Sequence, residues 1–413
     1  MKLSDSHKPT SDLFHSMPFS TDIMPLTSIR PGVVFAMRYP DDVGYVWSTL
    51  SRCYNLTAKL LISHADAFVA YPVLTGSPAY THEILRLIHA DFYNTAKANR
   101  SHLRAVVAAH HLRVVIFVGC SPSEVSLRFL HSLGLRTING EQDSYPVDAR
   151  QSFLYRALKY LFRSKLHYNI HDAYVANAEH QRDFLLSFAG LPPDRVHVAR
   201  NGIDTDLFTP GAAPDPSLYG LPQSDHYIVS ISQARPEKRV DFLLRIAERF
   251  FNLRPSASLT FIHVGDGPCL SRWREEAKSL GLENRFCFMG GHKDVVPFHR
   301  LASVFVHAAE RESFGYVLAE AMACEKPIVA TDAPGPREII ADGETGCLVG
   351  KNDLSAFVNA LLRLIDNHQL RLTMGFKGRQ RAVDIFSLGH TAKCNCLIIC
   401  QQLLLSSVRG NIL

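Results

Sequence analysis

The sequence predicts an α/β protein with two domains, each built on a doubly wound parallel sheet that helices cover on both faces. Short apolar runs alternate with longer amphipathic stretches along residues 32–202, and the alternation restarts along residues 227–367. Between these series, residues 204–225 contain four prolines, which is typical of a linker. Two Rossmann-like domains of this kind face each other across a cleft. We therefore expect the ligands to bind there, at the carboxyl ends of the strands.

The first series predicts an N-terminal domain over residues 31–203. Its strands are expected at residues 32–39, 67–73, 113–119, 135–139, 173–178 and 195–202. Its helices are expected at residues 46–61, 82–110, 124–134, 148–166 and 179–188. Residues 1–30 are polar and lack the apolar core of a signal peptide, so they predict a flexible N-terminal arm.

The second series predicts a C-terminal domain over residues 226–385. Its strands are expected at residues 227–232, 258–265, 285–290, 303–309, 326–332 and 343–349. Its helices are expected at residues 240–251, 269–280, 295–301, 314–324 and 355–367. The final stretch, residues 386–413, is apolar and helical in type, and we expect it to return to the first domain.

The composition indicates a folded protein without a strong charge bias. Of the 413 residues, 46% are hydrophobic and 20% are charged, which is enough apolar material for two cores. A net charge of +5 does not indicate a nucleic-acid partner, and it is compatible with anionic substrates or an anionic membrane surface. The nine cysteines are scattered, and Cys394, Cys396 and Cys400 lack the spacing of a zinc site. We expect reduced thiols in a cytoplasmic protein and no metal site.

The strongest functional signal is a pair of acids, Glu312 and Glu320, separated by seven residues around an expected helix start. The amides of Phe314, Gly315 and Tyr316 belong to the first turn, where they have no partner within the helix and favour a phosphate. A phosphate site flanked by two carboxylates that accept hydrogen bonds from hydroxyls fits a sugar nucleotide. The alternative is that Glu312 only complements the helix dipole and Glu320 lies on the surface.

Two further signals follow strands of the same domain. Arg235 and Lys238 come directly after the strand at residues 227–232 and would suit a diphosphate, although a solvated turn with ion pairs explains them equally well. Gly265 begins a Gly-Asp-Gly-Pro stretch after the next strand. That stretch lacks the dinucleotide-binding fingerprint, and alone it indicates only a turn.

Taken together, these stretches resemble the retaining glycosyltransferases of family 4, which have the GT-B fold. The stretches that carry the resemblance are RNGID (200–204), ARPEKRVDFLL (234–244), HVGDGP (263–268), the segment from Glu312 to Glu320, and residues 320–350. The resemblance implies a retaining hexosyltransferase that moves a hexose-type sugar from a nucleotide diphosphate donor to a hydroxyl acceptor. It also implies a role in glycan, surface polysaccharide or glycolipid biosynthesis. The implied reaction uses no cofactor and no metal.

The resemblance also implies roles for individual residues. Lys238 would bind the donor diphosphate with Arg235 as a second cation, Glu312 would contact the donor sugar, and Glu320 would bind the ribose hydroxyls. The remaining donor-binding positions are Ser313, Phe314, Gly315, Tyr316, Gly265 and Gly44. Gly44 lies in a loop that touches the donor phosphate in many members, although a simple turn explains it equally well.

Three departures from the family pattern stand out. Gln233 replaces a usual arginine, so Arg235 is expected to supply that charge. Glu325 replaces the usual glycine after the Glu320 helix, so the helix end is expected to differ. A first-domain histidine that follows a strand in many members is missing, and the sequence leaves open which residue takes its place: Asn139, Glu141 or Asp143.

The sequence says less about the acceptor and the binding partners than about the donor. Residues 152–169 are apolar and basic, which favours a helix packed on the sheet but also allows one that lies on a membrane surface near a lipid-linked acceptor. The expected location is cytoplasmic, with peripheral membrane contact left open. Two other classes remain open: a GT-B sugar-nucleotide epimerase, and a degenerate, non-catalytic glycosyltransferase-like partner subunit.

Overall fold

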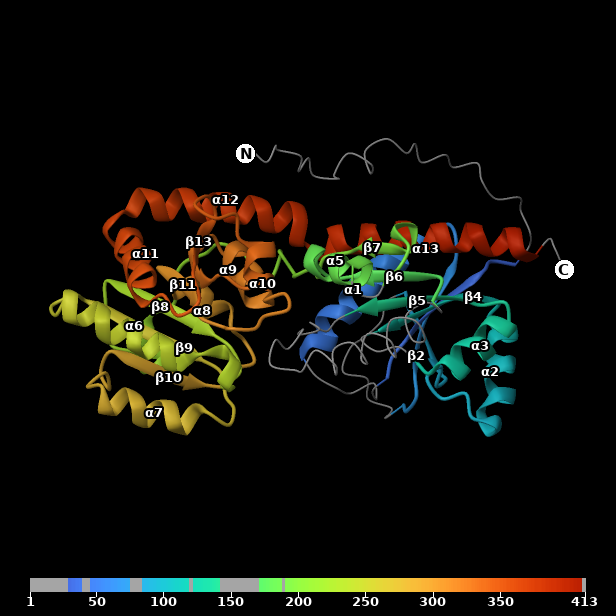
Figure 1. Cartoon of the computed structure of the whole chain (residues 1–413), viewed down its shortest axis with the longest axis horizontal. Helices are drawn as coiled ribbons and strands as arrows, with labels where there is room; N and C mark the ends of the chain where they lie inside the picture. The colour runs from blue at the N-terminus through green and yellow to red at the C-terminus, as the bar shows by residue number, and fades with distance from the viewer. Residues whose placement is uncertain are drawn as a thin grey trace. The chain divides into compact units, whose positions relative to one another are not determined.

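Two parallel sheets form the framework of the chain (Figure 1). The computed structural model describes residues 29–38, 45–74, 84–118, 122–141, 171–187 and 190–410. Residues 31–413 form one compact unit. The predicted arm at residues 1–30 falls almost wholly outside the described residues, and the amphipathic stretch at 152–169 falls wholly outside them.

The first sheet has seven parallel strands in the order β3-β2-β1-β4-β5-β6-β7. They are β1 (Gly32–Ala36), β2 (Asp66–Tyr71), β3 (Arg86–His89), β4 (Leu112–Val118), β5 (Arg136–Glu141), β6 (Ala173–Ala176) and β7 (Val196–Val198). The associated helices are α1 (Tyr45–Leu61), α2 (Lys97–Ala109), α3 (Glu124–Ser132) and α5 (Glu179–Ser187). Successive side chains of a strand point to opposite faces, so each central strand contributes side chains to two cores, one on each face of the sheet. Val33 and Phe35 of β1 pack with α1, whereas Val34 packs with α2 and α3.

The second sheet has six parallel strands in the order β10-β9-β8-β11-β12-β13. They are β8 (His226–Ile231), β9 (Leu259–Val264), β10 (Phe286–Gly290), β11 (Val304–His307), β12 (Ile328–Thr331) and β13 (Gly346–Val349). The helices α6 (Val240–Leu253), α7 (Leu270–Ser279) and α11 (Leu354–Asp366) contribute to the core on one face. The other face carries α8 (Val296–Leu301), α9 (Tyr316–Ala323), α10 (Pro334–Ile339) and the end of α12 (His368–Phe386).

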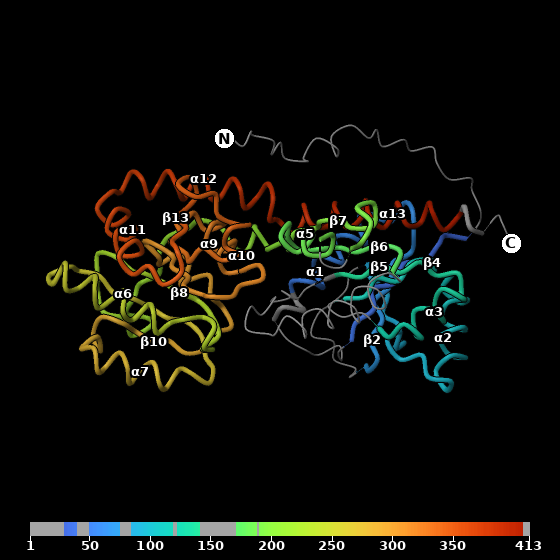
Figure 2. Tube along the Cα trace, in the orientation of Figure 1, coloured from blue at the N-terminus to red at the C-terminus, as the bar shows by residue number. Residues whose placement is uncertain are grey.

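The last helix, α13 (Leu388–Gly410), packs against the first sheet beside α1 (Figure 2). Its side chains Cys396, Ile399 and Leu403 are buried in the same core as α1. The Arg136 guanidinium of β5 donates to Gln402 of this helix at 2.8 Å. The chain therefore crosses between the sheets twice, once through the linker and once between α12 and α13.

The two crossings run side by side. Ile203 donates its N–H to the carbonyl of Phe386 at 2.7 Å, and Leu388 donates to the carbonyl of Ile203 at 2.9 Å. A Cβ on Gly202 would lie only 2.8 Å from the Leu388 Cα, so only glycine allows this approach. The linker, residues 204–225, contains one short 3-10 turn at Pro216–Tyr219 and no strand or α-helix.

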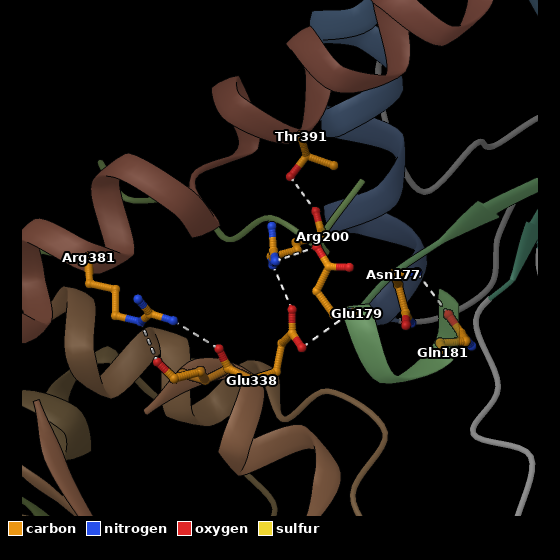
Figure 3. A network of polar contacts seen from close by, with 8 residues as sticks. Asn177, Glu179, Gln181, Arg200, Glu338, Arg381 and Thr391 are labelled. Atoms are coloured by element: carbon orange, nitrogen blue, oxygen red, sulfur yellow. Dashed lines mark hydrogen bonds and ion pairs between the residues drawn. The ribbon is translucent and has the colours of Figure 1, made fainter. Parts of the chain in front are cut away.

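A polar network lies where the linker begins (Figure 3). Arg200 donates its Nε to Glu338 of α10 at 2.6 Å and its Nη2 to Glu179 of α5 at 2.9 Å. The carboxylate of Glu338 also accepts the backbone N–H of Glu179 at 3.2 Å, which belongs to the free first turn of α5. Arg381 of α12 donates to the Glu338 carbonyl at 3.1 Å. An acid from the second sheet's helices therefore caps a helix of the first sheet.

Three elements differ from the sequence prediction. The helix expected at residues 82–110 is wrong in its first part, where the structure has the edge strand β3 and then α2. Only Ile88 of that strand is buried, so it has little apolar pattern to recognise. The sequence also did not indicate α10, whose first turn contains Pro334 and Pro336, or α12 before residue 386. The helix expected at residues 148–166 lies outside the described residues.

Glu325 adopts the left-handed backbone conformation that glycine normally supplies, with φ of 59°. The expectation that this helix end would differ is therefore wrong. The carbonyl oxygen of Glu325 packs against α12, where a Cβ on Gly375 would lie 2.1 Å from it. The position keeps its geometry because the surrounding packing holds it, at a cost for a non-glycine residue.

Among the described residues, no helix is both long and apolar enough to cross a bilayer. Eight of the nine cysteines lie in this part of the chain, and all eight are free thiols. No cluster of metal-ligating side chains occurs within the same ranges.

Replacing Glu325 with glycine should raise the free energy of unfolding by up to about 1 kcal/mol, because it relieves the left-handed penalty. Chemical denaturation of the purified protein measures this change. Glu344→Gly, at an exposed position without a positive φ, is the matched control and should give no gain. A Glu325→Gly protein no more stable than the wild type contradicts the argument.

Replacing Glu338 with alanine should lower the free energy of unfolding by about 1–3 kcal/mol, because it leaves the Nε of Arg200 and a first-turn amide of α5 without their acceptor. The Glu338 side chain is only 9% exposed, so water replaces it poorly. Asp332→Ala removes an exposed pair with Arg337 and should cost at most about 1 kcal/mol. Urea unfolding of both variants tests the contrast, and equal losses would refute it.

Candidate functional site

The carboxyl ends of β8 and β11 meet where the strand order of the second sheet reverses. The chain leaves β8 towards β9 and β10, and later restarts on the other side of β8 with β11. Ligands of open α/β sheets bind at this kind of switch point. Lys238 follows β8 in a 3-10 turn, and Glu312 follows β11. A backbone hydrogen bond of 3.0 Å from Glu310 to Glu237 ties the two loops together.

Glu312 stands at the centre of a three-residue cluster. Lys238 Nζ lies 2.6 Å from Glu312 Oε2, and Nε2 of His307, the last residue of β11, lies 3.1 Å from the same oxygen. The Glu312 side chain is 12% exposed, that of Lys238 is 21% exposed and that of His307 is 2% exposed. Both donors therefore hold one oxygen of an enclosed carboxylate.

The cluster keeps Glu312 ionised. Burial alone pushes the pKa of its carboxyl up, but the hydrogen bond and charge of His307, together with Lys238, lower that pKa to about 2. Glu312 is thus an anion across the neutral range. It can accept hydrogen bonds from hydroxyls but has no proton to donate.

The loop after Glu312 opens α9 in the predicted way. Gly315 has φ of 95°, a conformation in which a side chain would be strained, and it immediately precedes the first residue of α9, Tyr316. Phe314 is buried in the core of the second sheet, while Ser313 and Tyr316 are half-buried. Tyr316 also lines a small cavity with Tyr54 of α1 and Asn201, which follows β7.

This loop rests on α10. Gly335 donates its N–H to the Glu312 carbonyl at 3.0 Å. A Cβ on Gly335 would lie 2.6 Å from the Phe314 carbonyl oxygen, so the two backbones touch closely. The unpredicted helix α10 therefore supports the acidic loop from behind.

Glu320, the second acid, is more enclosed than the first. Its side chain is 4% exposed, and Oε2 lies 3.3 Å from Nε2 of His299 on α8. The His299 ring is itself fully buried and stacks on Phe305 of β11. The alternative of a surface position for Glu320 is therefore wrong.

The other predicted donor residues fall into three situations. Arg235 is exposed, and no ion pair includes it in the part of the chain that the structure describes. Packing requires a glycine at position 265, because a Cβ there would lie 1.8 Å from the Ser232 carbonyl oxygen in the loop that leads to Lys238. Gly44 lies outside the described residues.

The acceptor side is only partly described. Asn139 of β5 is buried at 2% exposure. Glu141 ends β5, but its side chain, like Asp143, lies outside the described residues. The question of which residue replaces the family's histidine therefore stays open.

Sequence reasoning missed both histidines that contact the acids. His307 lies five residues before Glu312, and His299 lies on a short helix twenty-one residues before Glu320. A histidine that ends an apolar strand carries no periodic signal. The only available hint was its position directly before the acidic loop.

Comparison with known families agrees with this geometry. Residues 216–381 match the family model described as Glycosyl transferases group 1. Residues 68–207 match the model described as Glycosyltransferase Family 4. The two matches cover most of both sheets.

One relative is alpha-maltose-1-phosphate synthase of Mycolicibacterium smegmatis, 31% identical over 241 residues, which are 54% of this chain and 61% of that protein. A second is D-inositol 3-phosphate glycosyltransferase of Thermobifida fusca, 31% identical over 221 residues, 51% of each chain. The chain thus spans about half to three fifths of these relatives.

Among solved structures, a glycosyltransferase from Rickettsia africae superposes with a TM-score of 0.73 at 17% identity, covering 91% of this chain and 99% of that one. Anabaena HepE in complex with UDP superposes with a TM-score of 0.68 at 17% identity, covering 90% and 100%. At such identities the likeness concerns the fold, which is GT-B. Together with the two family models and the acidic motif beside Lys238, these matches show that the chain belongs to the family 4 glycosyltransferases.

Proposed function

We propose that the protein transfers a hexose-type sugar from a nucleotide diphosphate donor to a hydroxyl acceptor, with retention of the anomeric configuration and without a metal. The observation that carries this proposal is the meeting of Lys238 and Glu312 at the switch point of the second sheet. One supplies a cation for a diphosphate and the other an ionised acceptor for sugar hydroxyls.

The leaving diphosphate needs positive partners if no metal supplies them. In our proposal these are Lys238, the exposed Arg235 and the first-turn amides of α9, with Ser313, Phe314 and Gly315 forming the backbone of the anion site. Gly315 allows a phosphate to approach the amides closely, because it carries no side chain. Gly265 supports this site indirectly, by letting its loop pack behind Ser232.

Glu320 is the proposed ribose ligand. Its carboxylate already accepts from His299, so ribose hydroxyls would have to share or replace that contact. Because the Glu320 side chain is only 4% exposed, the ribose can reach it only if the nucleotide binds deeply beside α9. This makes it the most informative residue for the donor assignment.

Related proteins support a choice of first donor and acceptor. Anabaena HepE has been solved with UDP-glucose, which supports a UDP-hexose as the first donor to try. WaaG, another structural neighbour, is described as a glycosyltransferase involved in lipopolysaccharide biosynthesis, which supports a glycan or glycolipid acceptor. We further propose that the protein acts in the cytoplasm as part of such a pathway.

Lys238→Ala should reduce sugar transfer by more than about a hundredfold, because the leaving diphosphate loses its main cation. Product formation from UDP-glucose and other sugar nucleotides measures it, with anomeric configuration read by NMR. Lys377→Ala, an exposed lysine on α12, is the matched control and should keep full activity. Full activity of Lys238→Ala would remove the site assignment.

Glu320→Gln should abolish most of the stabilisation that a nucleotide gives, because the neutral amide is a poorer acceptor for two ribose hydroxyls. For the wild type, a ligand at a hundredfold excess over its Kd adds about 2.7 kcal/mol of stability, which a thermal-shift assay detects. The glutamine variant keeps the side-chain size, so its own melting temperature without ligand serves as the folding control. An unchanged shift with nucleotide would exclude Glu320 as the ribose ligand.

A further inference from the structure

His307 is a buried histidine for which the proposed reaction has so far no use. It ends β11 with 2% of its side chain exposed, and its Nε2 faces Glu312 Oε2 at 3.1 Å. An ionised carboxylate accepts hydrogen bonds only, so the nitrogen that faces it carries a proton. The imidazole therefore donates its Nε2–H to Glu312.

Lys238 occupies the same carboxylate oxygen at 2.6 Å. In the proposed function Lys238 also binds the donor diphosphate, so the phosphate oxygens compete with Glu312 for its three donor hydrogens. A carboxylate that is 12% exposed cannot replace a lost partner well with water. Glu312 therefore needs a second donor that no phosphate can draw away.

We propose that His307 is the positioning residue for Glu312. Its Nε2–H holds Oε2, so that Glu312 stays ionised and in place while Lys238 turns to the diphosphate. The other oxygen, Oε1, has no hydrogen-bond partner among the described residues and is the one left for the donor sugar. This role rests on the proposed function of Glu312 and extends it.

The charged or titratable groups that act on Glu312 are His307 from β11 and Lys238 from the loop after β8. The nearby Arg239 pairs instead with Asp241 at 3.3 Å and with Glu310 at 3.8 Å. His307 is therefore the partner that Oε2 keeps when Lys238 turns to the diphosphate.

The decisive variants are His307→Phe, which removes the donor, and His307→Gln, whose side-chain amide keeps an N–H donor. For His307→Phe we expect kcat to fall about ten- to a hundredfold, the range for losing a hydrogen bond to a charged group. The pKa of Glu312 should rise from about 2, because its burial then acts with one partner fewer. Since the reaction needs the carboxylate, the acid limb of the pH–rate profile should move to higher pH. His307→Gln should restore most of kcat and the wild-type limb.

His263→Phe is the matched control. His263 lies on β9, is fully buried between Trp273 and Phe288, and contacts no carboxylate within the ranges that the structure describes. Its replacement should change the melting temperature but leave the acid limb where it is. If His307→Phe does not fold, His307→Asn, whose shorter side chain cannot reach Oε2, takes its place.

Titration of Glu312 by carboxyl-carbon NMR provides a readout without catalysis. A wild type that transfers sugar, combined with a His307→Phe variant whose limb and Glu312 titration are unchanged, overturns the role of His307 alone. A wild type that transfers no sugar from any sugar nucleotide overturns the proposed function, and the role of His307 with it. The role of His307 is also overturned if the phenylalanine and glutamine variants lose kcat equally and the losses follow their melting temperatures.

Discussion

A carboxylate enclosed by protein must keep partners for its charge, and this requirement organises the candidate site around Glu312. Removing one partner of a buried ion pair is strongly destabilising, because the remaining charge has neither protein nor water to compensate it. The partners of Glu312 come from two strands, Lys238 from the loop after β8 and His307 from the end of β11. The charge of one side chain thus holds together the two strand ends at which the sheet changes direction.

Two glycines, one in α10 and one in the loop after β9, support the two loops that meet there. Gly335 of α10 lies against the Glu312–Phe314 backbone, and Gly265 lies against the Ser232 carbonyl in the loop that leads to Lys238. At both positions an added Cβ would fall within 3 Å of a carbonyl oxygen. The functional side chains are therefore set by backbone contacts behind them, which is how a site keeps its geometry before the ligand arrives.

The sequence predicted most strands because strands buried on both faces are nearly continuous apolar runs. It did not predict β3, where Ile88 alone is buried, or α10, whose prolines indicate a turn. Within the site, helix starts and strand ends predicted Lys238, Glu312 and Glu320. The histidine partners could not be predicted, since His307 meets Glu312 only through the turn that follows β11. The contact of Glu338 with Arg200 depends likewise on where the segment after β7 passes α10.

The charge balance of the site bears on which ligand it selects. Without ligand, Lys238 is paired with Glu312, so a diphosphate does not meet a free lysine. In the proposed function, the exposed Arg235 and the first-turn amides of α9 would attract the diphosphate first, and the diphosphate would then compete for Lys238. Inorganic diphosphate would draw Lys238 from Glu312 and offer that carboxylate no new donor. A sugar nucleotide would draw the same lysine but would bring hydroxyls that donate to Glu312 Oε1, while His307 retained Oε2. On this proposal, the site would favour a ligand that presents a diphosphate and a sugar at once, because such a ligand leaves both Lys238 and Glu312 with partners.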